Sequence, residues 1–229
     1  MYFAIILAGG VGSRAGGSLP KQFQDIAGVP MLLRSIRAIR DALPQAAFVV
    51  VAHPDHHDRC IELISSAPDL QGLPYVVTDG GNSRVGSVIN GLDVITMSHI
   101  PTSEDIVLIH DAARPLVSAA VIEDALKLVG KGCGVVPAVP LSDSIRRVKD
   151  GATQSARRSD FVAVQTPQVF LLEDIVRAYG EVKDESLFTD DASVGEAAGL
   201  KILISKGDPS NIKITNPVDF LIAEQLVGK

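Results

Sequence analysis

The chain has 229 residues, of which 46% are hydrophobic, and its formal net charge is −6. This length and apolar content allow a sizeable core and fit one α/β domain better than two complete ones. The mild negative charge is spread along the chain, which argues against non-specific nucleic-acid binding because the phosphates would need a basic surface. An anionic substrate must therefore meet local groups of cations.

No apolar run is long enough to cross a bilayer, and Met1 leads directly into an apolar strand-like segment without the basic start of a signal peptide. We therefore expect a cytoplasmic protein without a membrane partner. Cys60 and Cys133 lie far apart and form no CxxC motif, so we expect them to fill apolar space rather than form a disulfide or a zinc site.

Short runs rich in β-branched residues predict buried strands, which in chain order cover residues 4–7, 48–51, 75–77, 106–109 and 135–139. The intervening segments carry apolar residues at three- and four-residue spacing, as amphipathic helices do. These helices are expected at residues 30–42, 55–66, 83–97 and 118–129. The alternation predicts an α/β fold, with a Rossmann-like, mostly parallel sheet and helices on both faces.

The alternation stops at a polar segment, residues 140–164, which centres on the turn-like sequence Lys149-Asp150-Gly151. A hairpin is the best interpretation, because glycine and aspartate favour tight turns. Helical patterns return at 172–182 and 190–198, followed by a strand at 201–204 and a closing helix after Pro217. We predict one domain over residues 1–229 with a protruding β-arm at 140–164.

The first expected strand runs into a glycine-rich loop. This loop places Gly9, Gly10 and Gly12 ahead of two cations, Arg14 and Lys21. Glycine lets main-chain N–H groups approach phosphate oxygens closely, and the cations can stabilise a transferring phosphoryl group. The loop therefore predicts backbone contact with a phosphorylated ligand.

Two common nucleotide-binding motifs do not fit this loop. A dinucleotide site needs a helix directly after the glycines and an acid at the end of the second strand, but Pro20 interrupts the first and residues 51–53 lack the second. A P-loop needs Gly-Lys-Ser/Thr at the start of the helix, and this loop has none.

A second candidate ligand loop lies at residues 79–88, where a turn after a strand opens a helix. Main-chain N–H groups and the Ser87 hydroxyl are expected at the same sheet edge as the first loop. We predict ligand contact for Gly81, Asn82 and Ser87, and an ordinary N-cap role for Ser83.

Asp111 follows a buried strand, at the end where open α/β sheets bind ligands. Mg²⁺ prefers one or two carboxylates together with substrate phosphates and waters, so this single aspartate predicts a metal site. His110 points to the opposite side of its strand, and we expect it to be packed and hydrogen-bonded rather than a general base.

Three further features have structural interpretations. The polar cluster at residues 53–58, which holds three histidines and Asp58, is expected to be a solvated surface rather than a metal site. Residues 165–168 and 189–192 are expected to be turn and helix-cap elements. Lys213 is expected in an apolar strand, where a cation needs a partner.

Several motifs together resemble one enzyme family. The run Gly-Gly-Val-Gly-Ser-Arg at 9–14, ahead of Pro-Lys-Gln-Phe at 20–23, is similar to the opening motif of the 2-C-methyl-D-erythritol 4-phosphate cytidylyltransferases within the nucleotidyltransferase superfamily. His-Asp-Ala-Ala-Arg-Pro at 110–115 matches this family in full, and Asn-Ile-Lys-Ile-Thr at 211–215 resembles its closing motif. The motif order is preserved over nearly the whole chain.

The resemblance implies an enzyme that joins CTP and 2-C-methyl-D-erythritol 4-phosphate into CDP-methylerythritol and pyrophosphate, in non-mevalonate isoprenoid precursor biosynthesis. It implies catalytic charges on Arg14, Lys21 and Lys213, and Mg²⁺ on Asp111. The nucleotide-binding set implied by the resemblance includes Ala8 and Ala112 besides Gly9, Gly10, Gly12, Gly81, Asn82 and Ser87.

The resemblance also implies an acceptor site formed by Arg114, Ser144 and Arg158. In relatives the arm crosses a dimer interface, so a homodimer is expected in which Ser144 and Arg158 complete the partner subunit's site. Arg157 fits a solvated hairpin equally well. Two alternatives remain: a ribitol 5-phosphate cytidylyltransferase, and a non-catalytic nucleotide-binding regulator, which the presence of the cations and the metal carboxylate disfavours.

Overall fold

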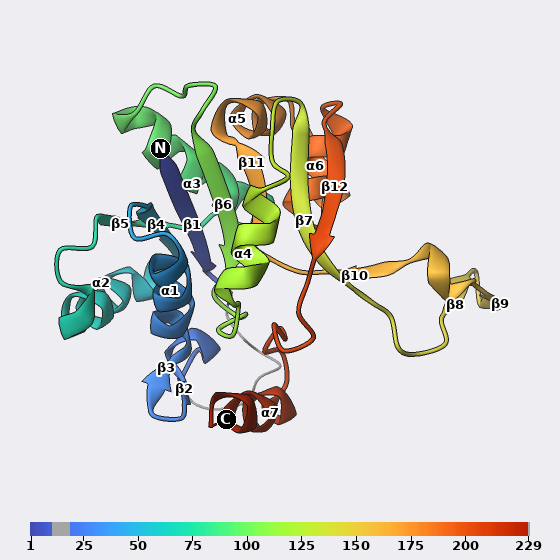
Figure 1. Cartoon of the computed structure of the whole chain (residues 1–229), viewed down its shortest axis with the longest axis horizontal. Helices are drawn as coiled ribbons and strands as arrows, with labels where there is room; N and C mark the ends of the chain where they lie inside the picture. Colours follow the sequence, from blue (N-terminus) through green and yellow to red (C-terminus); the bar gives the residue numbers. More distant parts are fainter. Residues whose placement is uncertain (11–18, 229) are drawn as a thin grey trace.

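The computed structural model describes residues 1–10 and 19–228. An eight-stranded mixed sheet forms its centre, with the order β10-β7-β11-β6-β1-β4-β5 and with β12 also paired to β7 (Figure 1). The strands of this sheet are β1 (Tyr2–Ala8), β4 (Ala47–Ala52), β5 (Tyr75–Asp79), β6 (Ile106–Asp111), β7 (Cys133–Pro140), β10 (Val162–Val164), β11 (Gln168–Leu171) and β12 (Lys201–Lys206).

Parallel pairing dominates the half of the sheet that carries the predicted ligand loops. Strand β1 lies between β4 and β6, and β4 pairs with β5, all in parallel. Strand β12 is parallel to β7, whereas β10 and β11 run antiparallel to their neighbours. The carboxyl ends of β5, β4, β1 and β6 therefore meet at one edge of the sheet.

Helices cover both faces of the sheet. One face packs against α1 (Met31–Ala42), α2 (His57–Ser65) and α4 (Ala119–Leu126), and the other against α3 (Arg84–Ser98), α5 (Leu172–Gly180) and α6 (Asp191–Ala197). The last helix, α7 (Pro217–Val227), packs beside the short hairpin of β2 (Asp25–Ile26) and β3 (Val29–Pro30). None of the helices within the described ranges is long and apolar enough to span a bilayer.

The residues of β1 contribute to the cores on both faces of the sheet and so show how the three layers are held together. Ala4 and Ile6 point into the core under α1, while Phe3 and Ile5 point into the core under α3, and all four are buried. A strand covered on both faces must be apolar at consecutive positions, which is the pattern that predicted it. Each fully buried isoleucine contributes about 1.5–3 kcal/mol. The predicted fold class is confirmed.

Two sequence-based expectations about local structure need correction, and one short hairpin was not predicted. Gln168, expected in a turn, begins β11, which pairs antiparallel with β6 in the register Gln168 to Ile109. The hairpin of β2 and β3 was not predicted. Lys213 does not lie in a strand; its segment has no regular secondary structure, and the backbone N–H of Ile214 donates to Ala113 O at 2.8 Å. The pairings of Gln168 and Ile214 depend on distant partners, so local periodicity does not encode them, whereas the β2–β3 hairpin pairs neighbouring residues.

The polar segment after β7 forms the hairpin that the sequence predicts. Its strands are β8 (Arg146–Lys149) and β9 (Ala152–Ser155), joined through Asp150 and Gly151 at φ values of 48° and 77°. Every residue of both strands is exposed. Figure 1 shows this arm reaching away from the layered body, on a stalk that includes β10.

Candidate active site

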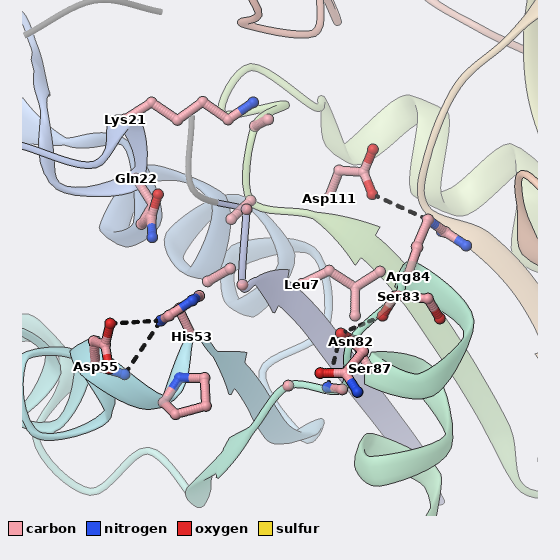
Figure 2. Close-up of a pocket in the computed structure, with 18 of the residues that line it drawn as sticks. Leu7, Lys21, Gln22, His53, Asp55, Asn82, Ser83, Arg84, Ser87 and Asp111 are labelled. Carbon is pink, nitrogen blue, oxygen red and sulfur yellow. Dashed lines mark hydrogen bonds and ion pairs between the residues drawn. The ribbon is translucent and has the colours of Figure 1, made fainter. Parts of the chain in front are cut away.

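A pocket of about 650 Å³ opens at the edge where the parallel strands end. The residues that directly follow β1, β4, β5 and β6 form its walls, together with Lys21, Gln22 and Lys213. Figure 2 shows Lys21 and Asp111 on one side of this space, with Asn82 and Ser87 on another. Such an edge is where open α/β sheets bind ligands.

The structure brings most of the predicted site residues together around this pocket. Those that line it are Ala8, Gly9, Gly10, Lys21, Gly81, Asn82, Ser87, Asp111, Ala112 and Lys213. The predictions for Gly12 and Arg14 fall outside the described residues.

Lys21 stands on a single 3₁₀ turn, Lys21–Phe23, that is anchored from behind. The Phe23 ring is buried, meets the edge of the His56 ring at 5.5 Å between centroids, and lies 4.7 Å below the guanidinium carbon of Arg59. Lys21 Nζ donates to Ile214 O at 3.0 Å. The aromatic anchor therefore fixes the turn while the lysine side chain reaches across the pocket wall.

Asp111 and Lys213 form a close charge pair in the pocket wall, with Lys213 Nζ 2.6 Å from Asp111 Oδ2. Burial alone would raise the pKa of Asp111, but the cations of Lys213 and Arg84 outweigh it and lower the pKa to about 2. The carboxylate is therefore charged throughout the physiological range. The Lys213 side chain is 44% exposed, and Asp111 is the charged partner that we expected this lysine to need.

His110 supports Asp111 from behind the strand. It is fully buried, and burial lowers its pKa to about 4. Its Nε2 lies 3.0 Å from Arg114 O, which can only accept, so the proton of the neutral ring is on Nε2. Nδ1 then accepts from the Thr166 hydroxyl at 3.0 Å, and that hydroxyl accepts from Asp111 N–H at 3.1 Å. The expected packed, hydrogen-bonded histidine is confirmed.

The loop before α3 is shaped by its own hydroxyls. Ser83 caps the helix, as expected, by accepting from Gly86 N–H at 2.9 Å. Ser87 Oγ accepts from Gly81 N–H at 3.2 Å and donates to Ser83 O at 2.8 Å, so this hydroxyl already organises the loop. A Cβ on Gly81 would lie 2.9 Å from the Cα of Gly86, which explains why glycine stands there.

Sequence reasoning missed three polar residues that line the pocket, Gln22, His53 and Asp55. The cluster at 53–58 is therefore only partly the solvated surface that was expected: His53 faces the pocket, whereas His57 pairs with Asp79 at 2.6 Å. His53 Nδ1 accepts from Asp55 N–H at 3.2 Å. The sequence did hold a signal for His53, because this residue directly follows β4 and therefore lies at the same sheet edge as Asp111.

Arg84 is a fourth residue that was missed. It is the first residue of α3, lines the pocket, and forms two hydrogen bonds with the buried carboxylate of Asp191, at 2.8 and 2.6 Å. Its Nε lies 3.7 Å from Asp111 Oδ1. Asp191, expected only as part of a helix cap, is thus the anchor of a pocket cation, while Asp190 forms the capping box of α6.

Arg114 does not line the pocket. Its guanidinium donates to Asn211 O at 2.8 Å and to Val164 O at 3.2 Å. Asn211 is buried and donates to Thr166 O at 3.0 Å. The segment that carries Lys213 is therefore fastened to the body through Arg114, a structural task that the prediction of acceptor binding did not include.

Ser144 and Arg158 lie on the arm and are not among the residues that line the pocket of their own chain. Arg158 is exposed and donates to the backbone oxygen of Ser142. Within one chain, the described residues thus assemble the predicted nucleotide side of the site but leave the predicted arm residues apart from it.

A metal ion is compatible with this pocket only if the substrate shares in binding it. Within residues 1–10 and 19–228, no three His, Cys, Asp or Glu side chains come together in a way that could hold a metal ion. Asp111 is ionised and at the pocket wall, and Mg²⁺ commonly uses one carboxylate with phosphate oxygens and waters. The residues therefore fit a metal bound jointly with a phosphorylated substrate.

The fold and this pocket, with lysines beside an ionised carboxylate and open loops after parallel strands, define a nucleotidyltransferase. The family model for 2-C-methyl-D-erythritol 4-phosphate cytidylyltransferase matches residues 2–229. The chain belongs to this family, as the sequence motifs indicated.

Two relatives and two solved structures of this name illustrate the similarity. The chain is 36% identical to the Streptomyces coelicolor 2-C-methyl-D-erythritol 4-phosphate cytidylyltransferase, over 99% of this chain and 84% of that one. It is 38% identical to the enzyme of Cereibacter sphaeroides strain KD131, over 98% and 96% of the two chains. The Thermus thermophilus crystal structure superposes with a TM-score of 0.75 at 28% identity, covering 100% of both chains. The Francisella tularensis structure gives a TM-score of 0.78 at 26% identity, covering 98% of each chain.

Proposed function

We propose that this protein joins CTP and 2-C-methyl-D-erythritol 4-phosphate to give CDP-methylerythritol and pyrophosphate, a step of non-mevalonate isoprenoid precursor biosynthesis. The observation that carries the proposal is the charge arrangement of the pocket. Asp111 lies 2.6 Å from Lys213, and Lys21 lines the same space. Family membership supports the choice of the two substrates.

The chemistry needs positioning and charge more than proton transfer. An oxygen of the acceptor phosphate attacks the α-phosphorus of CTP in line; the new P–O bond forms as the bond to the β-phosphate oxygen breaks and pyrophosphate leaves. Lys21 and Lys213 offset the charge that develops on the α-phosphate and on the leaving group. Because a phosphomonoester has its second pKa near ~6, the attacking oxygen is already ionised and no general base is required.

Mg²⁺ is the metal we propose. Asp111 would hold it, together with phosphate oxygens of CTP, and Lys213 would be released from Asp111 Oδ2 to meet the phosphates. When bound, the ion supplies neutralisation of phosphate charge. The ionised state of Asp111 supports this role, since a metal ligand must be deprotonated.

The acceptor side is proposed to be completed by a second copy of the chain. In this homodimer, Ser144 and Arg158 of the arm would reach the partner's pocket, and Arg114 would contribute to acceptor binding from the body. The exposure of both arm strands, away from their own pocket, supports the proposal. A sedimentation measurement that finds only monomer at assay concentrations would contradict it. The cytoplasmic location stays a prediction from the sequence.

The experiment that tests the activity is pyrophosphate release from CTP with each acceptor offered in turn. We expect turnover with 2-C-methyl-D-erythritol 4-phosphate and much slower turnover with ribitol 5-phosphate. Turnover with ribitol 5-phosphate alone would overturn the acceptor assignment. Calorimetric binding of CTP without turnover on either acceptor would favour a non-catalytic regulator.

A further inference from the structure

The two carboxylate oxygens of Asp111 face different cations. Oδ2 is 2.6 Å from Lys213 Nζ, and Oδ1 is 3.7 Å from Arg84 Nε. Figure 2 shows Arg84 extending toward Asp111 from the start of α3. A carboxylate can rotate about its last side-chain bond, and a cation at each oxygen fixes that rotation.

The two cations differ in how firmly they are held. Lys213 carries its charge on a flexible side chain that is 44% exposed, and its segment has no regular secondary structure. The Arg84 side chain is 25% exposed, and its two terminal nitrogens are both bonded to Asp191, whose side chain is fully buried. A planar guanidinium bound at both terminal nitrogens has little freedom to move.

Asp191 is itself fixed by its surroundings. Tyr179 OH donates to Asp191 Oδ1 at 2.6 Å, and the backbone N–H of the next residue, Ala192, donates to Gln168 Oε1 at 2.7 Å. Gln168 begins β11, which pairs with β6, the strand that ends at Asp111. The anchor of Arg84 stands at the start of α6 and is tied through Ala192 to β11, the neighbour of the strand that ends at Asp111.

The position of Arg84 is unfavourable on local grounds. A cation in the first turn of a helix lies at the positive end of the helix dipole, and partial burial adds to the cost. The ion pair with Asp191 offsets this cost. If Arg84 served only to join α3 to α6, however, its Nε would not need to face Asp111 in the pocket.

We propose that Arg84 is a positioning residue that holds Asp111 through Oδ1, so that Oδ2 is the exchangeable oxygen at which Lys213 gives way to a divalent cation bound with the nucleotide. This inference rests on the proposed function and deepens it. Lysine could not replace Arg84, because a single ammonium cannot bond Asp191 at two points and also face Asp111.

The test compares Arg84→Lys with a matched control, Arg37→Lys. Arg37 makes a similar two-point contact with Asp69, at 2.9 and 2.6 Å, but does not line the pocket. We expect Arg84→Lys to lower kcat roughly 10- to 100-fold, as loss of a partner behind a metal ligand typically does, and to leave the KM for the acceptor within about twofold. Arg37→Lys should leave both constants unchanged.

A second readout does not depend on turnover. Mn²⁺ is titrated into each protein with saturating CTP and no acceptor, and free Mn²⁺ is followed by electron paramagnetic resonance. Arg84→Lys should weaken Mn²⁺ binding roughly 10-fold, while calorimetry of CTP without metal gives an unchanged Kd. Thermal melting of both variants and of Asp191→Asn shows whether a loss of kcat or of Mn²⁺ affinity comes from unfolding.

Wild-type kcat and wild-type Mn²⁺ affinity in a folded Arg84→Lys protein would overturn the positioning role. A loss of CTP affinity without metal, equal to the loss of Mn²⁺ affinity, would also overturn it, because Arg84 would then contact the nucleotide itself. If the unmodified protein releases no pyrophosphate from CTP, the proposed function fails, and the Mn²⁺ titration still decides the role of Arg84.

Discussion

The pocket and the arm differ in what holds their polar residues in place. In the pocket, Asp111 is surrounded by Lys213, Arg84 and the Thr166 hydroxyl, and each of these is tied to another part of the body. On the arm, every residue of both strands is exposed, and the side-chain contact of Arg146 is to Thr153, across the same hairpin.

The difference shows that the two regions have different relations to function. A two-stranded hairpin without a core is marginally stable in water, so the arm cannot fix its side chains as the body does. The body therefore holds the proposed nucleotide-binding groups within one chain, whereas the proposed role of the arm depends on a second subunit. The variants below test this division, from the largest expected effect to the smallest.

Lys21→Ala should lower turnover by roughly 10²-fold or more, because a charge that stabilises the transition state is lost from a prepared site. The melting temperature should change little, since the anchor of this turn is Phe23. Steady-state pyrophosphate release measures the effect. Lys127→Ala, at an exposed lysine paired with Asp124, is the control. Near-normal turnover of Lys21→Ala would remove this lysine from the catalytic set.

Acid should weaken the body through His110. Because burial lowers the pKa of His110 to about 4, the folded protein keeps this ring neutral while the unfolded chain protonates it near pH 6.5. Stability from this residue is complete above pH 6.5 and is lost as the pH falls toward 4, by an amount on the order of 3 kcal/mol.

Urea unfolding at pH 7, 5.5 and 4 measures this loss. A variant with the hairpin of β8 and β9 replaced by a short linker should show the same pH dependence, since the arm holds no histidine. A His110 imidazole signal that titrates near pH 6.5 in the folded protein would contradict the prediction.

Arg158→Ala should raise the KM for the acceptor about tenfold, as expected for one charged hydrogen bond, and leave CTP binding unchanged. The effect should appear only in the dimer. Mixing Arg158→Ala subunits with Lys21→Ala subunits can reveal it. Arg157→Ala, at the neighbouring position, is the matched control and should have little effect. Equal losses in both variants would indicate a general effect of charge on the arm.

Thr153→Ala should change the free energy of unfolding by no more than about 0.5 kcal/mol, because its hydroxyl contacts an exposed arginine at the protein surface. Chemical denaturation at protein concentrations where the chain is a monomer measures this change. A loss above 1 kcal/mol there would show that the arm is more firmly structured than its exposure indicates.

The sequence by itself determined the alternating layers and the sheet edge that carries the pocket. Strand β1 could be predicted because both faces of a buried strand must be apolar, and Asp111 because it follows such a strand. The arm was predicted from the polar interruption and its turn residues. These features are local, and a local pattern is fully present in the chain.

Only the tertiary structure decided which charges meet. Arg84 and Asp191 are 107 positions apart, and the Asp111 carboxylate between Arg84 and Lys213 depends on how α3 and the closing segment pack on the sheet. Arg114 and β11 likewise took their roles from distant partners. Helical or strand period encodes which face is buried, but it does not encode the partner across the core, because that choice depends on packing of the whole chain.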